Sequence, residues 1–145
     1  MAETYRTIDD LLPHREPFVF VDRLTYCTSD EVHGEYTFRG DEVFFRGHFP
    51  GHPIVPGVLL VEMMAQCGGA GMKQAGVIPE KGLFFLATIE KTKFRKEVKP
   101  GDTCVIELKN LRASRSMIKQ TGKIKVNGEV YTEATWMCII GVSEE

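Results

Sequence analysis

The sequence lacks several features that would place the protein in a broad functional class at once. Its four cysteines form no CxxC pair and do not stand at zinc-ligand spacing with a histidine, which argues against a zinc site or a dithiol redox centre. The formal net charge of −2 provides no general attraction to nucleic acid or to an anionic membrane surface. We therefore expect buried reduced thiols, no metal, no cofactor and no nucleic-acid partner.

Long hydrophobic runs and targeting signals are also missing. The most apolar stretch, Val58 to Ala70, is too short for a membrane span and contains Glu62 and Gln66. The opening residues, MAETYRTIDD, show no basic segment followed by an apolar run, so no signal peptide is predicted. With 145 residues and 43% hydrophobic residues, the chain suits a single domain over 1–145. A cytoplasmic enzyme or binding module is what remains.

Glycine and proline are concentrated in one place, residues 47–57, where three of each predict a shaped loop rather than a regular element. Proline at the first turn favours a helix from about Pro56 to Ala75, ending at Gly76. Its side chains are apolar on nearly every face, which is typical of a buried helix. Three glycines near its end, at 68, 69 and 71, indicate that something packs closely there.

The remaining chain shows strand patterns and turn signals. A short helix is predicted from Thr7 to Leu12, with Thr7 as its cap and Pro13 as its stop. Asn127-Gly128 is a strong hairpin signal. One buried helix and many antiparallel strands predict an α+β fold in which a curved sheet wraps the helix. Strands are predicted over 18–27, 31–38, 83–90, 91–98, 102–113, 117–126 and 129–142.

Two ionisable residues lie where chemistry is plausible. Glu62 is the one ionisable residue between Gly57 and Met72, and a buried carboxyl must be paired, hydrogen-bonded or protonated. Gln66, four residues on, can hold it on the same helix face. His48 lies in the loop that leads into this helix, and an imidazole can remove a proton near neutral pH. The simpler alternatives are a structural Glu62–Gln66 pair and a structural or solvated histidine.

The helix start is a third candidate element. Pro56-Gly57 leaves backbone N–H groups free at the positive end of the helix dipole, and Gly57 lets a ligand carbonyl approach the main chain. A thioester carbonyl held there would be polarised. A base, an acid and these donors together indicate proton abstraction next to a carbonyl, followed by loss of a β-hydroxyl. An ordinary helix start is the alternative.

A local basic cluster is the last feature. Lys91, Lys93 and Arg95 alternate with other residues, so a regular strand would place all three on one face. Such a face could dock an acidic protein or a phosphate, or could be an ordinary solvated surface. Of the other histidines, His14 is expected to be structural, His33 solvated, and His52 near the site entrance without an assigned role.

The sequence closely resembles the FabZ family, the 3-hydroxyacyl-acyl carrier protein dehydratases of type II fatty acid synthesis, over almost its whole length. The resemblance is carried by LLPHREPFVFVDR, FFRGHFPGHPIVPGVLLVEMMAQ and FLATIEKTKFRKEVKPGD. It implies a hotdog fold and dimers with active sites at the subunit interface, often assembled into hexamers. It also implies an acyl carrier protein partner with a phosphopantetheine-linked acyl chain.

Site roles follow from the same resemblance. It implies that His48 is the base, that Glu62 is the acid supplied by the other subunit, and that Gly57 holds the carbonyl. It further implies that the backbone carbonyl near Ile54 orients the imidazole. The related FabA dehydratase-isomerases carry aspartate where this chain has Glu62, which favours plain dehydration. A hotdog thioesterase, a non-catalytic carrier-binding module and a dehydratase of a polyene or polyketide pathway stay open as alternatives.

Overall fold

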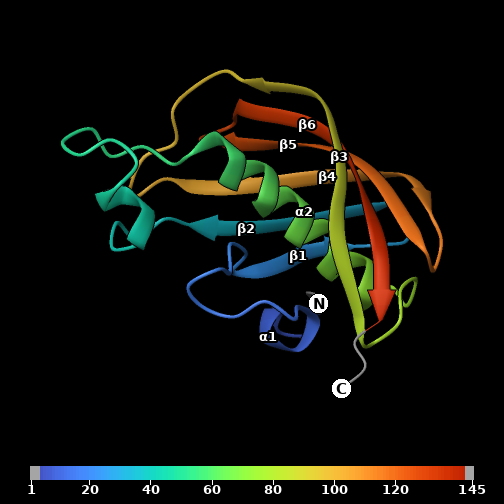
Figure 1. The fold of residues 1–145 in the computed structure, drawn as a ribbon. Coiled ribbons are helices and arrows are strands. Elements are labelled where there is room, and N and C mark those ends of the chain that lie inside the picture. The colour runs from blue at the N-terminus through green and yellow to red at the C-terminus, as the bar shows by residue number, and fades with distance from the viewer. Residues whose placement is uncertain (1–3, 143–145) are drawn as a thin grey trace.

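A six-stranded antiparallel sheet curves around one long helix (Figure 1). This computed structural model describes residues 4–142, so residues 1–3 and 143–145 of the predicted domain lie outside the described residues. The strand order is β1-β2-β4-β5-β6-β3, with β1 and β3 at the two edges. The strands are β1 (Arg23–Cys27), β2 (Glu31–Thr37), β3 (Gly82–Phe94), β4 (Thr103–Ala113), β5 (Met117–Val126) and β6 (Glu129–Val142).

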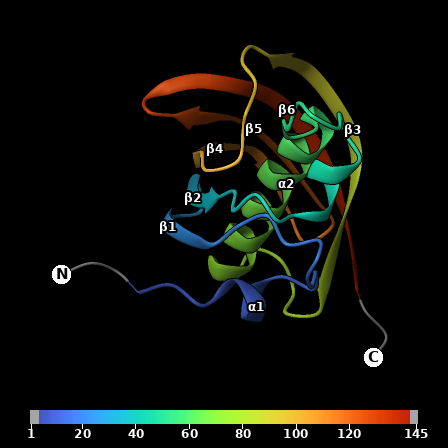
Figure 2. The same cartoon turned by 90° about the vertical axis from the view of Figure 1, so that its left-hand side faces the viewer.

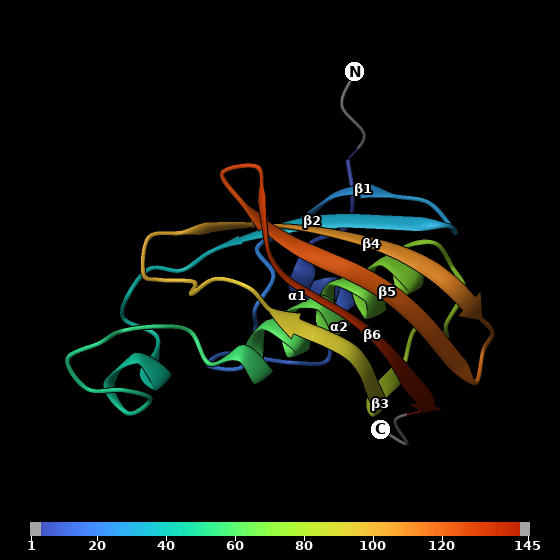
Figure 3. The ribbon, with the colours of Figure 1, turned by 90° about the horizontal axis from the view of Figure 1, so that it is seen from above.

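Helix α2 (Gly57–Gln74) lies within the curve of the sheet, and Figure 2 shows the strands bending around it. The predicted burial is confirmed, because every residue from Leu60 to Lys73 except Glu62 is buried. The short predicted helix is also confirmed as α1 (Ile8–Leu11), with Thr7 as its N-cap. A 3₁₀ helix, η1 (Val43–Arg46), and the loop to α2 extend beyond the sheet (Figure 3).

Close packing explains the glycines of α2. A Cβ added to Gly68 would lie 2.0 Å from the Gln120 amide oxygen on β5. One added to Gly69 would lie 2.4 Å from the Phe84 ring on β3, and one added to Gly71 would lie 2.4 Å from Val32 on β2. The prediction that something packs tightly on this end of the helix is therefore confirmed, from three different strands.

Turn chemistry fixes the last hairpin. Asn127 and Gly128 both have positive φ, 51° and 82°, as a two-residue type I′ turn requires. Strands β5 and β6 therefore begin and end where the sequence predicted.

Two strand predictions were wrong in extent. Residues 18–22 precede β1 instead of belonging to it, because the Gln66 side chain binds the backbone of Phe18 and Phe20 where a neighbouring strand would. The predicted strands 83–90 and 91–98 are one strand, β3, which absorbs a bulge at Lys91 (φ 52°) and resumes its pairing with β6 at Lys93.

One edge of the sheet carries exposed apolar side chains. On β3, Phe85, Ile89 and Phe94 are 56%, 50% and 53% exposed, although the strand pairs with β6 along its other side. A long edge strand with apolar side chains is a ready template for pairing with another chain.

Candidate active site

His48 is held by the backbone of its own loop. Its N–H donates to the carbonyl of Phe44 in η1 (2.9 Å), and its ring stacks on Phe49 with centroids 4.1 Å apart. The ring Nδ1 lies 3.0 Å from the carbonyl oxygen of Ile54. A carbonyl oxygen only accepts, so in the neutral ring this contact places the proton on Nδ1 and leaves the lone pair on Nε2.

A cavity of about 390 Å³ brings His48 and the start of α2 together. Gly57, the first residue of the helix, lines it with His48, Ile54 and the Phe94 ring. A Cβ on Gly57 would lie 2.8 Å from that ring, so only glycine leaves the helix N-terminus open here. The cavity therefore joins a base to the free N–H groups of a helix end, which suits a polarised carbonyl.

Glu62 lies one and a half turns further along α2 and is held by Gln66. The Gln66 amide nitrogen donates to Glu62 Oε2 and to the Phe18 carbonyl, both at 3.0 Å. Its amide oxygen accepts from the N–H of Phe20 at 2.9 Å, which fixes the orientation of the amide. Burial raises the pKa of Glu62 above its ordinary value, and the Gln66 hydrogen bond offsets part of that rise. A carboxyl in this environment keeps its proton to a higher pH than an exposed one.

His14 lies beside Glu62, a contact that the sequence did not indicate. It was expected to be structural, and its Nε2 lies 3.6 Å from Glu62 Oε2. Its ring lies between Phe18 and Phe84, with centroid distances of 6.3 and 5.5 Å. Forty-eight residues separate His14 from Glu62, so no local periodicity could reveal the contact. Its place in the LLPHREPF segment was the one available signal.

The structure does not join the two predicted catalytic residues within one chain. Over residues 4–142, no hydrogen bond or ion pair connects His48 with Glu62, and the cavity lined by His48 is not lined by Glu62. His48 faces the cavity at the N-terminus of α2, whereas Glu62 faces Gln66 and His14. The two residues therefore lie in separate surroundings within one chain.

The basic cluster is not the regular face that the sequence predicted. The bulge at Lys91 shifts the register between Glu90 and Lys93, which breaks the alternation. Arg95 lies beyond the end of β3 and pairs with Glu133 at 3.2 Å. Lys91 and Lys93 stay exposed on the strand. The prediction of three cations on one face by alternation was therefore wrong.

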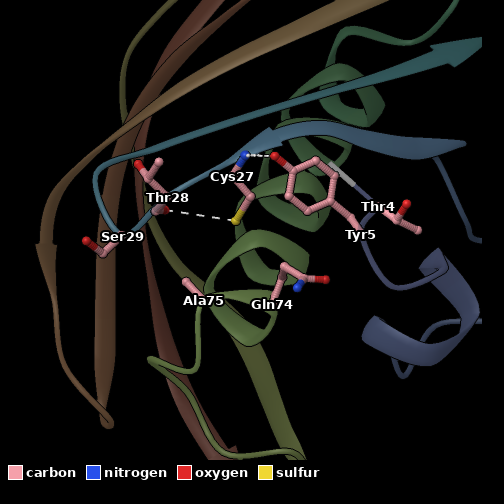
Figure 4. A pocket seen from close by; sticks show the side chains of 7 residues that line it. All are labelled: Thr4, Tyr5, Cys27, Thr28, Ser29, Gln74 and Ala75. Carbon is pink, nitrogen blue, oxygen red and sulfur yellow. Dashed lines mark hydrogen bonds between the residues drawn. The ribbon is translucent and has the colours of Figure 1, made fainter. Parts of the chain in front are cut away.

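Other hollows of the molecule contain none of the predicted catalytic residues. One of about 580 Å³ lies at the C-terminal end of α2 and is lined mostly by small and polar side chains (Figure 4). Its Cys27 donates from sulfur to the Gly71 carbonyl at 3.1 Å. Cys67, Cys104 and Cys138 are buried and free, as predicted, whereas Cys27 is half-buried.

Among residues 4–142, no group of three His, Cys, Asp or Glu side chains is placed to hold a metal ion. No helix in the same range is long and apolar enough to span a bilayer.

Comparison with known proteins gives consistent results. Residues 12–135 match the model of the FabA-like domain family. The 3-hydroxyacyl-acyl-carrier-protein dehydratase FabZ of Fusobacterium nucleatum is 41% identical over 133 residues, covering 89% of this chain and 91% of that protein. FabZ of Sodalis glossinidius is 40% identical over 131 residues, covering 89% and 87%.

Solved structures extend the likeness to the fold. The dehydratase heterocomplex ApeI:P of Xenorhabdus doucetiae superposes with a TM-score of 0.81 at 21% identity, covering 98% of this chain and 95% of that one. A hypothetical thioesterase of Streptococcus pneumoniae, solved with coenzyme A, has a TM-score of 0.62 at 12% identity, covering 85% and 88%. The predicted α+β hotdog fold is confirmed.

Proposed function

Because the chain belongs to the FabA-like domain family, and within it to the FabZ dehydratases, we propose that it dehydrates (3R)-3-hydroxyacyl-acyl carrier protein. The product is the trans-2-enoyl thioester, and the pathway is type II fatty acid biosynthesis. The observation that carries this proposal is the identity of about 40% with FabZ proteins over 89% of the chain. The arrangement of His48, Gly57 and Glu62 supplies the chemistry.

His48 is the base that removes the proton from the carbon next to the thioester carbonyl. The Ile54 carbonyl 3.0 Å from Nδ1 keeps the ring proton on that nitrogen, so Nε2 has a lone pair for the substrate. The shared cavity lets the thioester carbonyl reach the N–H groups at Gly57 while its α-carbon approaches the imidazole. Negative charge that develops on the carbonyl oxygen is stabilised by these donors and by the helix dipole.

Glu62 is the acid that protonates the departing β-hydroxyl. The raised pKa favours the protonated carboxyl that this step needs, and Gln66 fixes its orientation. Water then leaves as the double bond forms. His48 then holds one extra proton, on Nε2, and Glu62 has lost one, so transfer of a proton from His48 to Glu62 restores the starting state.

A dimer completes the site. His48 and Glu62 of one chain face different surroundings, and the β3 edge with its exposed Phe85 and Ile89 offers a pairing surface to a second copy. We place the His48 of one subunit opposite Glu62 of the partner subunit. Further association of such dimers into hexamers follows the family pattern.

The substrate arrives on an acidic acyl carrier protein. Lys91 and Lys93 are exposed near the end of β3, beside the cavity that Phe94 and Arg95 line. Their positive charge supports docking of the carrier, with Arg95 contributing less because Glu133 neutralises it.

One assay separates dehydration from hydrolysis. The protein is incubated with a 3-hydroxyacyl carrier thioester, and enoyl formation and free thiol release are followed in the same sample. Dehydration predicts enoyl product with the thioester intact. Thiol release without enoyl product would instead support a thioesterase, and neither product would leave a non-catalytic carrier-binding module. A polyketide-type 3-hydroxyacyl substrate, compared with an unbranched one, separates the two dehydratase alternatives.

A further inference from the structure

We infer that His14 is a positioning residue for Glu62. His14 donates a hydrogen bond from Nε2 to Glu62 Oε2, so the transferable proton of the carboxyl is carried by Oε1. This inference rests on the proposed function of Glu62 as the acid. It assigns to the histidine of the LLPHREPF segment a task in the dehydration.

The two nitrogens of His14 have different surroundings. Nε2 lies 3.6 Å from Glu62 Oε2, whereas Nδ1 is buried without a hydrogen-bond partner among the described residues. A neutral imidazole has one N–H, and an unpaired buried donor is costly. The ring proton is therefore better placed on Nε2, where an acceptor is available. Burial also lowers the pKa of His14, which favours this neutral ring.

Both neighbours of Glu62 act on the same oxygen. Gln66 donates to Oε2 at 3.0 Å, and His14 approaches that oxygen from its own loop. Among residues 4–142, no hydrogen bond to Oε1 is present. Two donors on Oε2 disfavour a proton there, so the acidic proton of the carboxyl belongs on Oε1. With its proton confined to Oε1, the carboxyl can donate that proton only from this oxygen.

Packing holds the His14 ring in this position. Phe18 and Phe84 flank the ring, and Phe84 fits against α2 because Gly69 has no side chain. Phe18 is itself tied to the helix by the bond from Gln66 to its carbonyl. The distance of 3.6 Å is longer than a hydrogen bond, and such contacts in unliganded sites tighten when substrate is bound.

Few other titratable groups face this pair. Cys138 on β6 lies within electrostatic range of Glu62, and Lys73 and Arg15 lie within range of His14. Within residues 4–142, none of these three side chains forms a hydrogen bond with the side chain of Glu62 or His14.

The test compares variants that keep or remove the donor. His14→Gln can place an amide N–H near the position of Nε2, and His14→Leu keeps bulk without a donor. We expect kcat of His14→Leu to fall about tenfold with KM little changed, and kcat of His14→Gln to stay within about threefold of wild type. His33→Leu is the matched control, because His33 pairs with Glu31 at a similar 3.4 Å, outside the site. If His14→Leu does not fold, His14→Asn replaces it, since its amide stops short of Glu62.

A double-mutant cycle distinguishes positioning from a general structural role. In the Glu62→Gln background, His14→Leu should cause no further loss of kcat, because the acid it serves is gone. The inference would be overturned if the kcat losses of His14→Leu and Glu62→Gln multiplied in the double variant. It would also be overturned if His14→Leu kept the wild-type kcat, or if His14→Gln lost as much kcat as His14→Leu.

A titration by carboxyl-carbon NMR tests the contact without any turnover. Loss of a donor to the carboxylate should raise the pKa of Glu62 in His14→Leu, and His33→Leu should leave the pKa of Glu62 unchanged. An unchanged or lowered pKa in His14→Leu would overturn the inference. If the wild type forms no enoyl product, the proposed function fails, and this titration still decides whether His14 binds Glu62.

Discussion

His48 and Ile54 are joined across the loop that precedes α2, with the imidazole Nδ1 3.0 Å from the Ile54 carbonyl oxygen. Six residues separate them, and the segment contains the glycines and prolines that shape the loop. Two residues beyond Ile54 the chain enters the helix whose first residue, Gly57, lines the same cavity. The tautomer of the neutral His48 ring and its distance from the helix end are thus set by one short piece of backbone.

Loss of either proposed catalytic group should remove turnover without unfolding the protein. His48→Ala removes the base, and Glu62→Gln retains the shape and the acceptor for Gln66 but has no proton to give. We expect each to reduce dehydration by roughly two to four orders of magnitude, measured with a carrier thioester. Circular dichroism should show folded protein for both. Near-native turnover of either variant would exclude that residue from the chemistry.

Mixing the two inactive variants should restore part of the activity. If each site takes His48 from one subunit and Glu62 from the other, a mixed dimer has one site with both groups intact. We expect partial recovery after subunit exchange, followed as enoyl formation over time. Absence of recovery, with exchange demonstrated by labelled subunits, would place both groups of a site in the same chain.

Glu62 should make the fold less stable as pH rises. Its folded-state pKa is raised by burial, so the native state keeps the proton after the unfolded state has lost it. The stability of the wild type therefore falls relative to Glu62→Gln as pH rises from the ordinary carboxyl pKa through the raised one. Between pH 4 and pH 8, the melting temperature of Glu62→Gln should increase relative to that of the wild type as pH rises. A constant difference would mean that the carboxyl is not perturbed.

Gly57 should tolerate no side chain. A Cβ there would lie 2.8 Å from the Phe94 ring and would narrow the cavity shared with His48. Because that ring is half exposed and can move, we expect Gly57→Ala to fold but to lose kcat/KM by about tenfold or more. Adding Phe94→Leu should recover a part if crowding is the cause. Full activity of Gly57→Ala would show that the carbonyl does not approach this residue.

Lys93 should matter for the carrier rather than for the chemistry. Charge reversal at Lys93 removes a long-range attraction that salt screens over about 8 Å at physiological ionic strength. We expect lower turnover of carrier-bound substrate and a flatter salt dependence, with a short pantetheine thioester little affected. Arg95→Glu should have a similar but smaller effect, since Glu133 pairs with Arg95. Lys125→Glu, on a lysine paired with Glu107, is the control.

If both substrates lose activity to the same extent, Lys93 shapes the site or the fold, and the carrier binds elsewhere.

Much of the fold could be predicted because its signals are local. Asn127-Gly128 fixed the ends of β5 and β6, and the Gly/Pro loop marked the start of α2. The strand predicted over 18–27 was too long at its start, because the helix residue Gln66 binds the backbone of Phe18 and Phe20. A hydrogen bond across 46 residues leaves no periodic trace in the sequence.

The candidate site shows the same division. His48 and the start of α2 are close in sequence, so their shared cavity followed from the motif. The contact between His14 and Glu62 depends on how the N-terminal loop packs against Phe84, and only the folded chain brings these residues together. The bulge at Lys91 likewise depends on pairing with β6, so simple alternation misplaced the basic residues.

The glycines at 68, 69 and 71 have a consequence for how this protein can change. Gln120, Phe84 and Val32 approach α2 from three strands, so the depth of the helix is fixed from three sides. The distance between α2 and these strands is therefore set by the absence of side chains at the three glycines. A change in the size of the interior cannot come from larger residues on α2 at these positions, because an added Cβ would overlap a strand side chain. A larger interior instead requires shorter side chains on the strands, which can be introduced one residue at a time without shifting the axis of α2.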